Sequence, residues 1–335
     1  MKKCLITLQE VSSLENLIEA WSEFIRGKRN KKDVQAFSLS LSDHIVNLHD
    51  DLEKGTYTHG PYQHFPINDP KPRSIHKATV RDRLLHHALH RKLYPAYAPL
   101  FIADSFSCQE GKGLHIALNR FEKTARKVSR NHTRTCWVLK GDIRKFFASV
   151  DHAKLNEILS SRIEDECLMY LLSNVIESFH VTPGKGIPLG NLTSQLFANI
   201  YLNELDQFVK QGLGIKHYLR YADDFVFLSH DREGLLSFIS LIQSFLVERL
   251  ALSLHPDKVH LQTFASGVDF LGWTHFPHHR VPRTKTRQRM QSKLQKSLKN
   301  ETLQSYLGLL SHGDAFELRR SLLNQYWLWR EKDDP

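Results

Sequence analysis

The chain has 335 residues, a formal net charge of +10, and 41% hydrophobic residues. This length allows one large core or two to three smaller lobes of an ordinary globular protein that needs no disulfide staples. Its four cysteines form no C-x-x-C pair, which argues against a disulfide framework or a zinc ribbon. No apolar run could span a bilayer, and Gln9 and Glu10 interrupt the start before a secretory signal forms. We therefore expect a soluble, cytoplasmic protein with no membrane partner, whose basic surface favours nucleic acid as a partner.

The first 150 residues are predicted to be mainly helical. Apolar residues at helical spacing predict helices between Ser12 and Lys54, and four prolines predict an irregular or extended segment over Pro61–Pro72. Further helices are expected around Leu84–Leu93 and over His115–Ser129. The run Thr135–Asp142 then predicts a strand that ends on a carboxylate.

The rest of the chain alternates helices with short strands. The pattern predicts helices at His152–Ser160 and Leu168–Phe179, a glycine- and proline-rich loop, a long helix from Leu192 to Val209, a hairpin over Tyr218–Ser229, a helix over Leu235–Leu250, short strands in 259–264 and 268–275, and a helical C-terminal region. This order describes an α+β fold with an antiparallel sheet and helices on one of its faces.

Two adjacent carboxylates, Asp223 and Asp224, interrupt the apolar and aromatic residues of the predicted hairpin. The tight break would project both side chains from one end of the sheet. Crowded hard oxygen ligands suit Mg²⁺ or Mn²⁺. Taken alone, the same pair is also typical of a solvated turn.

Asp142 ends the predicted strand 135–142. If this strand lies beside the hairpin, Asp142 and Asp223 can converge on one pair of metal ions, as two-metal phosphoryl transfer requires. Asp142 could equally cap the turn toward Phe146.

A basic stretch near the C-terminus runs from Arg280 to Asn300 and contains no acidic residue. Lys285, Arg289 and Lys293 recur at helical spacing, which aligns three cations on one side of a helix. Together with Arg283 they predict a phosphate-binding surface, although a solvated helix face has the same pattern.

Five ordered blocks resemble the signature motifs of reverse transcriptases. They read Leu-Lys-Gly-Asp-Ile-Arg-Lys-Phe-Phe at 139–147, Gly-Ile-Pro-Leu-Gly-Asn-Leu-Thr-Ser-Gln at 186–195, Tyr-Ala-Asp-Asp at 221–224, Leu-Ser-Leu-His-Pro-Asp-Lys at 252–258 and Phe-Leu-Gly-Trp at 270–273. The resemblance implies a right-hand polymerase fold, with an N-terminal helical extension (1–60), fingers and palm (61–278) and a small basic thumb (279–335). It implies RNA-templated DNA synthesis from a primer, with deoxynucleoside triphosphates as substrates.

The resemblance also assigns roles to matching residues. Asp142 and Asp223, with the Ile143 carbonyl, would bind two Mg²⁺ ions, Mn²⁺ being an alternative, and Asp224 would support them. A cation would bind the triphosphate of the incoming nucleotide, and a bulky ring would exclude a nucleotide with a 2′-hydroxyl. Lys258 would protonate or stabilise the departing pyrophosphate. The residues implied for nucleotide binding are Arg73, Arg83 (or Arg81), Phe147, Gly190 and Gln195. Gly272 and Trp273 match the primer grip, and hydrophobic packing would explain the same residues.

Gln195 indicates which subfamily of reverse transcriptases the chain resembles. Most reverse transcriptases have Ser-Pro here, whereas this chain has Ser194-Gln195, a form that resembles the enzymes of diversity-generating retroelements. A flexible residue with an amide beside the incoming nucleotide would loosen nucleotide selection, and a glutamine that is merely tolerated at the start of the helix explains the same residue equally well. That resemblance implies error-prone copying of a template-repeat RNA, a bacterial or phage origin, and a small, basic, oligomeric accessory protein as a partner. A reverse transcriptase of a phage-defence system, another group II-like element and a non-catalytic RNA-binding scaffold are the alternatives.

Overall fold

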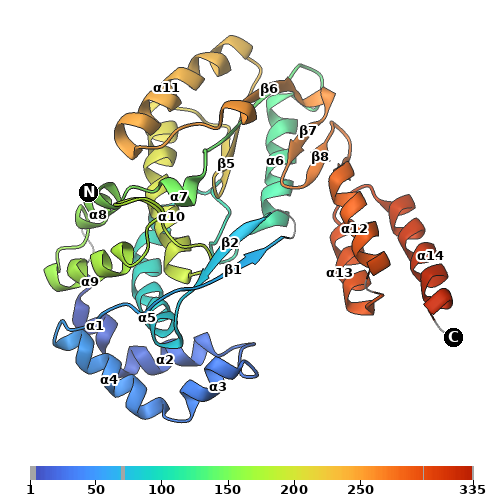
Figure 1. Cartoon of the computed structure of the whole chain (residues 1–335). Helices are drawn as coiled ribbons and strands as arrows, with labels where there is room; N and C mark the ends of the chain where they lie inside the picture. The colour runs from blue at the N-terminus through green and yellow to red at the C-terminus, as the bar shows by residue number, and fades with distance from the viewer. Residues whose placement is uncertain (1–4, 69–71, 297, 334–335) are drawn as a thin grey trace.

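The computed structural model describes residues 5–68, 72–296 and 298–333, and its first fifty described residues form a layer of helices. Thr7 and Ser13 cap the first two helices, each accepting a backbone hydrogen bond with its side-chain oxygen. The helices predicted between Ser12 and Lys54 are confirmed, and they pack around the long helix α5 (Figure 1). Their bounds are α1 Leu8–Ser12, α2 Leu14–Phe24, α3 Lys32–Ser38, α4 Leu41–Glu53 and α5 Val80–Tyr97.

The segment Pro61–Pro72 was predicted to be irregular or extended, and its described part is extended: it contains the first strand of a hairpin. Strands β1 (Gln63–Ile67) and β2 (Arg73–Lys77) pair antiparallel, with Pro66 opposite Ser74. Proline is tolerated because both strands of a two-stranded sheet are edges, where one row of N–H groups faces away from the partner. The hairpin extends from the body toward the C-terminal helices (Figure 1).

A four-stranded antiparallel sheet in the order β4-β5-β3-β6 lies at the centre. Val138 and Val226 face α6, while Leu139 and Phe227 belong to the core shared with α10 and α11. Helices therefore cover both faces, and the prediction of helices on one face is wrong. The bounds are β3 Trp137–Asp142, β4 Tyr218–Tyr221, β5 Asp224–Ser229, β6 His260–Thr263, α6 Leu114–Val128, α10 Leu192–Gln207 and α11 Arg232–Leu250.

Shorter elements connect these pieces. The predicted helices near 152–160 and 168–179 are present, and the long predicted helix ends in a π-helical turn. Their bounds are η1 Ala98–Leu100, α7 Phe146–Ser149, α8 His152–Ser160, α9 Glu166–Glu177, η2 Phe208–Gly212, η3 Pro256–Lys258 and η4 Phe264–Ser266.

A second antiparallel sheet precedes the C-terminal helices. The stretch 268–275 divides at Leu271-Gly272 into β7 (Val268–Phe270) and β8 (Trp273–His275), and β9 (Arg280–Pro282) adds a third strand. Residues 280–282 were predicted to be helical and are a strand instead, because the ladder to β8 satisfies their backbone. Three helices follow, α12 Thr284–Lys296, α13 Asn300–Leu310 and α14 Phe316–Asp333.

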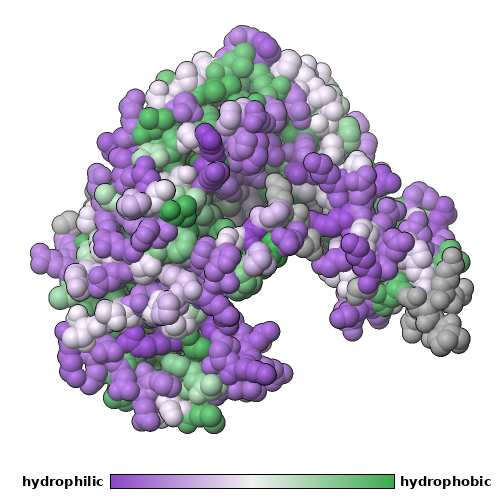
Figure 2. Space-filling view, in the orientation of Figure 1, coloured by the Kyte–Doolittle hydropathy of each residue, from purple (hydrophilic) through white to green (hydrophobic). Residues whose placement is uncertain are grey.

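The C-terminal helices have a core of their own, which includes Met290, Leu303 and Leu322. They stand apart from the body, and a hollow separates the two parts on the face shown in Figure 2. None of the described helices is both long enough and apolar enough to cross a membrane.

Candidate active site

Three carboxylates meet at one end of the central sheet. Asp142 is the last residue of β3 and lies opposite Asp224, the first residue of β5. Asp223 directly precedes Asp224 and lies in the two-residue turn that joins Tyr221 of β4 to β5. The hairpin and its neighbouring strand are therefore confirmed, and the sheet brings these side chains together.

The turn has an unusual backbone. Ala222 adopts a φ of +53°, the left-handed region that residues with a Cβ rarely occupy. Such a conformation costs free energy and persists where the surrounding structure determines it. The turn is thus held in place by its neighbours.

Two lysines partly neutralise the carboxylates. Lys258 Nζ lies 2.8 Å from Asp142 Oδ2, and Lys140 Nζ lies 3.8 Å from Asp224 Oδ1. Burial, and then the Asp142 charge, raises the pKa of Asp223 to about 6. Burial also raises the pKa of Asp224 and lowers the pKa of Lys140. A third negative charge is left without an equivalent cation, which is the electrostatic setting that a divalent ion relieves.

The donor set fits hard divalent cations, because it offers carboxylate oxygens on adjoining strands. Within the described ranges, no three Asp, Glu, His or Cys side chains already converge tightly enough to hold an ion. Lys258 Nζ lies on Asp142 Oδ2, so an ion at that oxygen would require Lys258 to release Asp142. Ile143 is buried, and its backbone pairs with Leu254 beside Asp142.

The alternative role of Asp142 as a cap is wrong. The N-cap of α7 is Lys145, which makes no side-chain capping bond. The carboxylate of Asp142 accepts a hydrogen bond from Lys258 instead.

A cleft of about 870 Å³ adjoins the acidic turn. It gathers residues from β2, α7, α10, β4 and β5 and from the loops between elements, so that side chains far apart in sequence share one space. Of the residues predicted from sequence, Arg73, Phe147, Gly190, Gln195, Asp223 and Asp224 line it.

Gly190 joins the hairpin β1–β2 to this cleft. Its φ is +108°, and a Cβ there would lie 2.9 Å from Ile75 Cγ2 of β2. The adjoining Leu189 carbonyl accepts a hydrogen bond from the His76 N–H at 3.0 Å. Asn191 Nδ2 donates to the His76 carbonyl, also at 3.0 Å. Strand β2, which carries Arg73, is therefore anchored to the start of α10.

Other predicted residues lie elsewhere. Arg83 does not line the cleft, because it forms an ion pair with Asp33 of α3 at 2.5 Å. Arg81 likewise pairs with Asp51 of α4. Both arginines hold the N-terminal helices, a role that their sequence context did not indicate.

The C-terminal candidates divide into two groups. Gly272 lies in the turn between β7 and β8. Leu271, in the same turn, lines the cleft, whereas Trp273 is buried. Arg283 forms an ion pair with Asp269, and burial lowers the pKa of its guanidinium. The remaining cations, Lys285, Arg289 and Lys293, lie along α12.

Sequence reasoning missed several residues at the site. Arg220, Asn199 and Leu271 line the cleft, and Lys140 pairs with Asp224. Arg220 is 0% exposed. A charged residue within a strand that is otherwise apolar was the available signal, because buried charges are normally paired.

Comparisons with known proteins agree with this geometry. Residues 66–275, more than half of the chain, match the family model described as reverse transcriptase (RNA-dependent DNA polymerase). Protein YkfC of Escherichia coli K12 is 26% identical over 298 residues, which cover 77% of this chain and 75% of that protein.

Two intron proteins are also similar. The group II intron-encoded protein LtrA of Lactococcus lactis subsp. cremoris is 29% identical over 177 residues, 50% of this chain and 28% of that protein. An uncharacterized 91 kDa protein in the cob intron of Schizosaccharomyces pombe is 32% identical over 136 residues, 39% of this chain and 16% of that protein. The chain belongs to the reverse transcriptase family, the RNA-directed DNA polymerases.

Proposed function

We propose that the chain extends a primer on an RNA template by two-metal nucleotidyl transfer at the acidic end of the β3–β5 sheet. The observation that carries the proposal is the meeting of Asp142, Asp223 and Asp224 beside a cleft of about 870 Å³. Asp142 and Asp223, with the Ile143 carbonyl, would hold two Mg²⁺ or Mn²⁺ ions, and Asp224 would support them. Bound divalent ions activate the attacking hydroxyl and stabilise the departing pyrophosphate.

The remaining residues of the cleft would bind the deoxynucleoside triphosphate. Arg73 is exposed on β2 and can pair with phosphate oxygens. Phe147 is half-buried and places a ring where it would exclude a 2′-hydroxyl. Lys258, once released from Asp142, is within reach of the same end of the sheet and would neutralise charge on the pyrophosphate.

The architecture supports a right-hand layout. Hairpin β1–β2 and its helices would be the fingers, the central sheet the palm, and α12–α14 the thumb. Support comes from the separate core of the C-terminal helices and the hollow between them and the body (Figure 2). The turn at Gly272 would then contact the primer, and α12 would contact nucleic-acid phosphates.

We further propose that the copied RNA is the template repeat of a diversity-generating retroelement. The support is Gln195, which stands in the cleft where most of the family has proline. A small basic accessory protein belongs to the same proposal by resemblance. Neighbouring DNA with two near-repeats that differ mainly at adenines would support the retroelement, and its absence would favour a phage-defence role.

Primer extension tests the catalytic proposal. Wild-type protein with oligo-dT on poly-rA and Mg²⁺ or Mn²⁺ should incorporate dTTP, and Asp142→Asn and Asp223→Asn should each lose at least about 10³-fold of this activity. Asp43→Asn, an exposed change on α4, is the matched control and should keep full activity. Equal incorporation by wild type and Asp223→Asn would refute the assignment, and a protein that binds RNA but extends no primer would support the scaffold alternative.

A further inference from the structure

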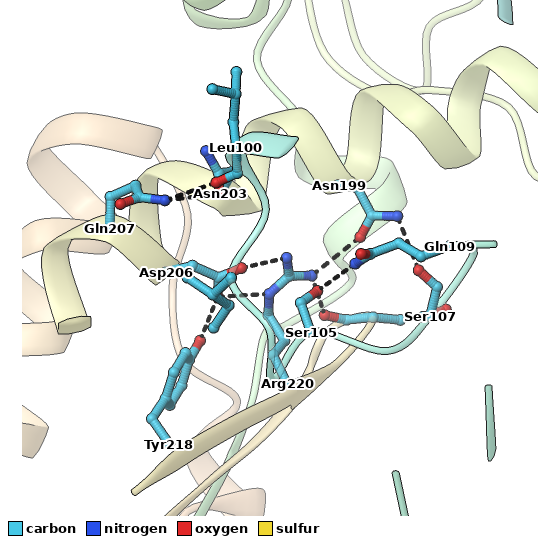
Figure 3. Close-up of polar contacts among 12 residues, drawn as sticks. Leu100, Ser105, Ser107, Gln109, Asn199, Asn203, Asp206, Gln207, Tyr218 and Arg220 are labelled. Carbon is cyan, nitrogen blue, oxygen red and sulfur yellow. Dashed lines mark hydrogen bonds and ion pairs between the residues drawn. The ribbon is translucent and has the colours of Figure 1, made fainter. Parts of the chain in front are cut away.

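Arg220 forms a fully buried ion pair directly before the acidic turn (Figure 3). Its Nε donates to Asp206 Oδ1 at 2.8 Å and its Nη2 to Asp206 Oδ2 at 2.6 Å, so the pair is bidentate. Tyr218 Oη donates to Asp206 Oδ1 at 2.8 Å. Asp206 lies on α10, so the pair ties strand β4 to the helix that carries Gln195.

The third arm of the guanidinium reaches the turn itself. Arg220 Nη1 donates to the carbonyl oxygen of Ala222 at 3.1 Å. That carbonyl belongs to the peptide group linking Ala222 to Asp223. The bond therefore fixes the orientation of the peptide that leads into the Asp223 carboxylate, at the residue whose φ is +53°.

The same arm reaches the wall of the cleft. Arg220 Nη1 lies 3.4 Å from Asn199 Oδ1, and Asn199 Nδ2 donates to the Ser107 carbonyl at 2.9 Å. Asn199 lies one helical turn after Gln195, and both line the cleft. One guanidinium thus connects the acidic turn, helix α10 and the segment around Ser107 (Figure 3).

Stability alone is a weak reason for this arrangement. Removing two charges from water costs about as much as their attraction returns, and apolar side chains of similar volume often serve a fold as well or better. The pairing with Asp206 also leaves the bond to Ala222 unexplained, because Asp206 already accepts from two of the guanidinium nitrogens.

We infer that Arg220, held by Asp206, is a positioning residue that fixes the Ala222–Asp223 peptide against α10 and so places the Asp223 carboxylate for divalent-cation binding. This inference rests on the proposed role of Asp223. It predicts that losing Arg220 weakens cation binding and the chemical step, while the exposed part of the cleft still binds the nucleotide.

The test uses the full chain with the triple change Arg220→Met, Asp206→Leu and Tyr218→Phe. The triple variant removes the ion pair and the tyrosine hydroxyl together, so that neither a buried charge nor that hydroxyl is left without its partner. The Ala222 carbonyl and Asn199 Oδ1 lose the donor whose effect is being tested. Free Mn²⁺ measured by electron paramagnetic resonance gives cation binding without reliance on activity. Thermal unfolding reports folding, and primer extension gives kcat and the dTTP KM.

We expect the triple variant to fold, to bind Mn²⁺ about tenfold more weakly and to lose about 10²-fold in kcat, with the dTTP KM changed less than about threefold. The matched control is Arg232→Met, an exposed arginine on α11, which should change none of these quantities. A folded triple variant with wild-type Mn²⁺ binding and kcat would overturn the inference and leave the proposed function intact.

Two further outcomes are a triple variant that does not fold and a failure of the proposed role of Asp223. If the triple variant does not fold, Arg220→Lys replaces it, because lysine keeps the charge toward Asp206 but has no counterpart of the Nη1 group that donates to the Ala222 carbonyl. Arg220→Lys should then show the same losses, and wild-type Mn²⁺ binding and kcat in that variant would overturn the inference. If wild type and Asp223→Asn bind Mn²⁺ equally, the proposed role of Asp223 fails, and this inference fails with it.

Discussion

At the scale of single residues, the acidic turn carries more negative charge than its lysines balance. Lys258 pairs with Asp142 and Lys140 lies near Asp224, while Asp223 remains between them with a raised pKa. The ionised Asp223 is therefore unfavourable in the folded protein without a metal ion.

This imbalance predicts that Asp223→Asn stabilises the metal-free protein in a pH-dependent way. An unfolded chain releases the Asp223 proton near pH 3.8, whereas the folded protein retains it up to about pH 6. The destabilisation by Asp223 therefore grows as the pH rises between these values and is fully present above them. Asparagine should raise the free energy of unfolding at pH 7.5 by at most about 3 kcal/mol, less after solvent screening, and by almost nothing at pH 4.

Thermal unfolding at both pH values in EDTA measures this difference. Saturating Mg²⁺ should reduce the advantage of Asp223→Asn at pH 7.5, since the ion stabilises the wild-type carboxylate. The exposed Asp43→Asn serves as the control and should not raise the melting temperature at either pH, because Asp43 lies in the first turn of α4, where a carboxylate favours the helix dipole. An equal shift at pH 4 and pH 7.5 would contradict the raised pKa.

Gln195→Pro should reduce misincorporation opposite template adenines. Proline removes the amide, stiffens the first turn of α10 and deletes the N–H that donates to the Asn191 carbonyl at 3.4 Å. The proline ring also approaches the Asn191 carbonyl, so the loss of stability should be about 1–3 kcal/mol. Sequencing of cDNA made on an adenine-containing template measures the error spectrum.

Gln195→Met is the matched variant, because it keeps the length of the side chain and the backbone N–H but lacks the amide. If the amide loosens nucleotide selection, both variants should make fewer errors at adenines. An unchanged spectrum in Gln195→Pro would count against a role for this position.

The sequence motifs predicted which residues lie together at the end of the sheet better than they predicted the residues that support them. Asp142, Asp223 and Lys258 stand in ordered motifs, and the structure places all three at the same end of the central sheet. Arg83 could not be placed, because a single arginine pairs with whichever carboxylate the fold supplies, here Asp33. The pairing of Arg220 with Asp206 likewise depends on where α10 lies against β4, which local pattern does not contain.

At the scale of elements, the contact between hairpin β1–β2 and the Gly190 loop controls where Arg73 lies. Gly190→Ala would place a Cβ 2.9 Å from Ile75 and force an L-residue to a φ of +108°. We expect β2 to shift, the dNTP KM to rise about tenfold and the free energy of unfolding to fall by about 1–3 kcal/mol.

Gly184→Ala separates these two effects. Gly184 lies in the same loop with a φ of +73°, but its added Cβ would meet nothing within 4 Å. It should therefore lower stability without raising the KM, as primer extension over a range of dTTP concentrations would measure. A KM that rises equally in both variants would contradict the role of the Ile75 contact.

Helices with a long hydrophobic periodicity were predicted correctly from the sequence. A short strand that depends on pairing with a neighbouring strand was not. The helices of the N-terminal layer and α10 have extended apolar faces. Strand β9 spans only Arg280–Pro282 and depends on its ladder to β8, so its basic sequence gave no strand signal. The continuous apolar run of β5 is typical of a strand buried on both faces, which agrees with the helices on both sides of the sheet.

At the scale of the whole molecule, the described residues pack into three hydrophobic cores. Leu17 and Phe24 of the N-terminal layer share one core with Leu84 of α5 and Phe225 of the sheet. The C-terminal helices pack around their own core instead. The N-terminal helices are thus structurally continuous with the body, whereas α12–α14 can present their basic surface as a unit.

This division predicts that the cations of α12 determine the salt dependence of nucleic-acid binding. Met290 and Leu294 form the buried face of α12, while Lys285 and Lys293 are exposed. Each phosphate contact adds about 0.9 to the slope of log K against log salt for a duplex. Replacing Lys285, Arg289 and Lys293 with Gln should therefore make the slope shallower by about 2 to 3 for an RNA–DNA duplex.

The control removes the same charge from another part of the molecule. Arg29, Lys31 and Lys32 are exposed near α3, and their replacement with Gln also lowers the net charge by three. Fluorescence anisotropy with a labelled duplex between about 50 and 300 mM salt gives both slopes. If binding follows total charge and not the position of α12, the two triple variants will change the slope equally, and α12 is then a solvated helix face and not a phosphate-binding surface.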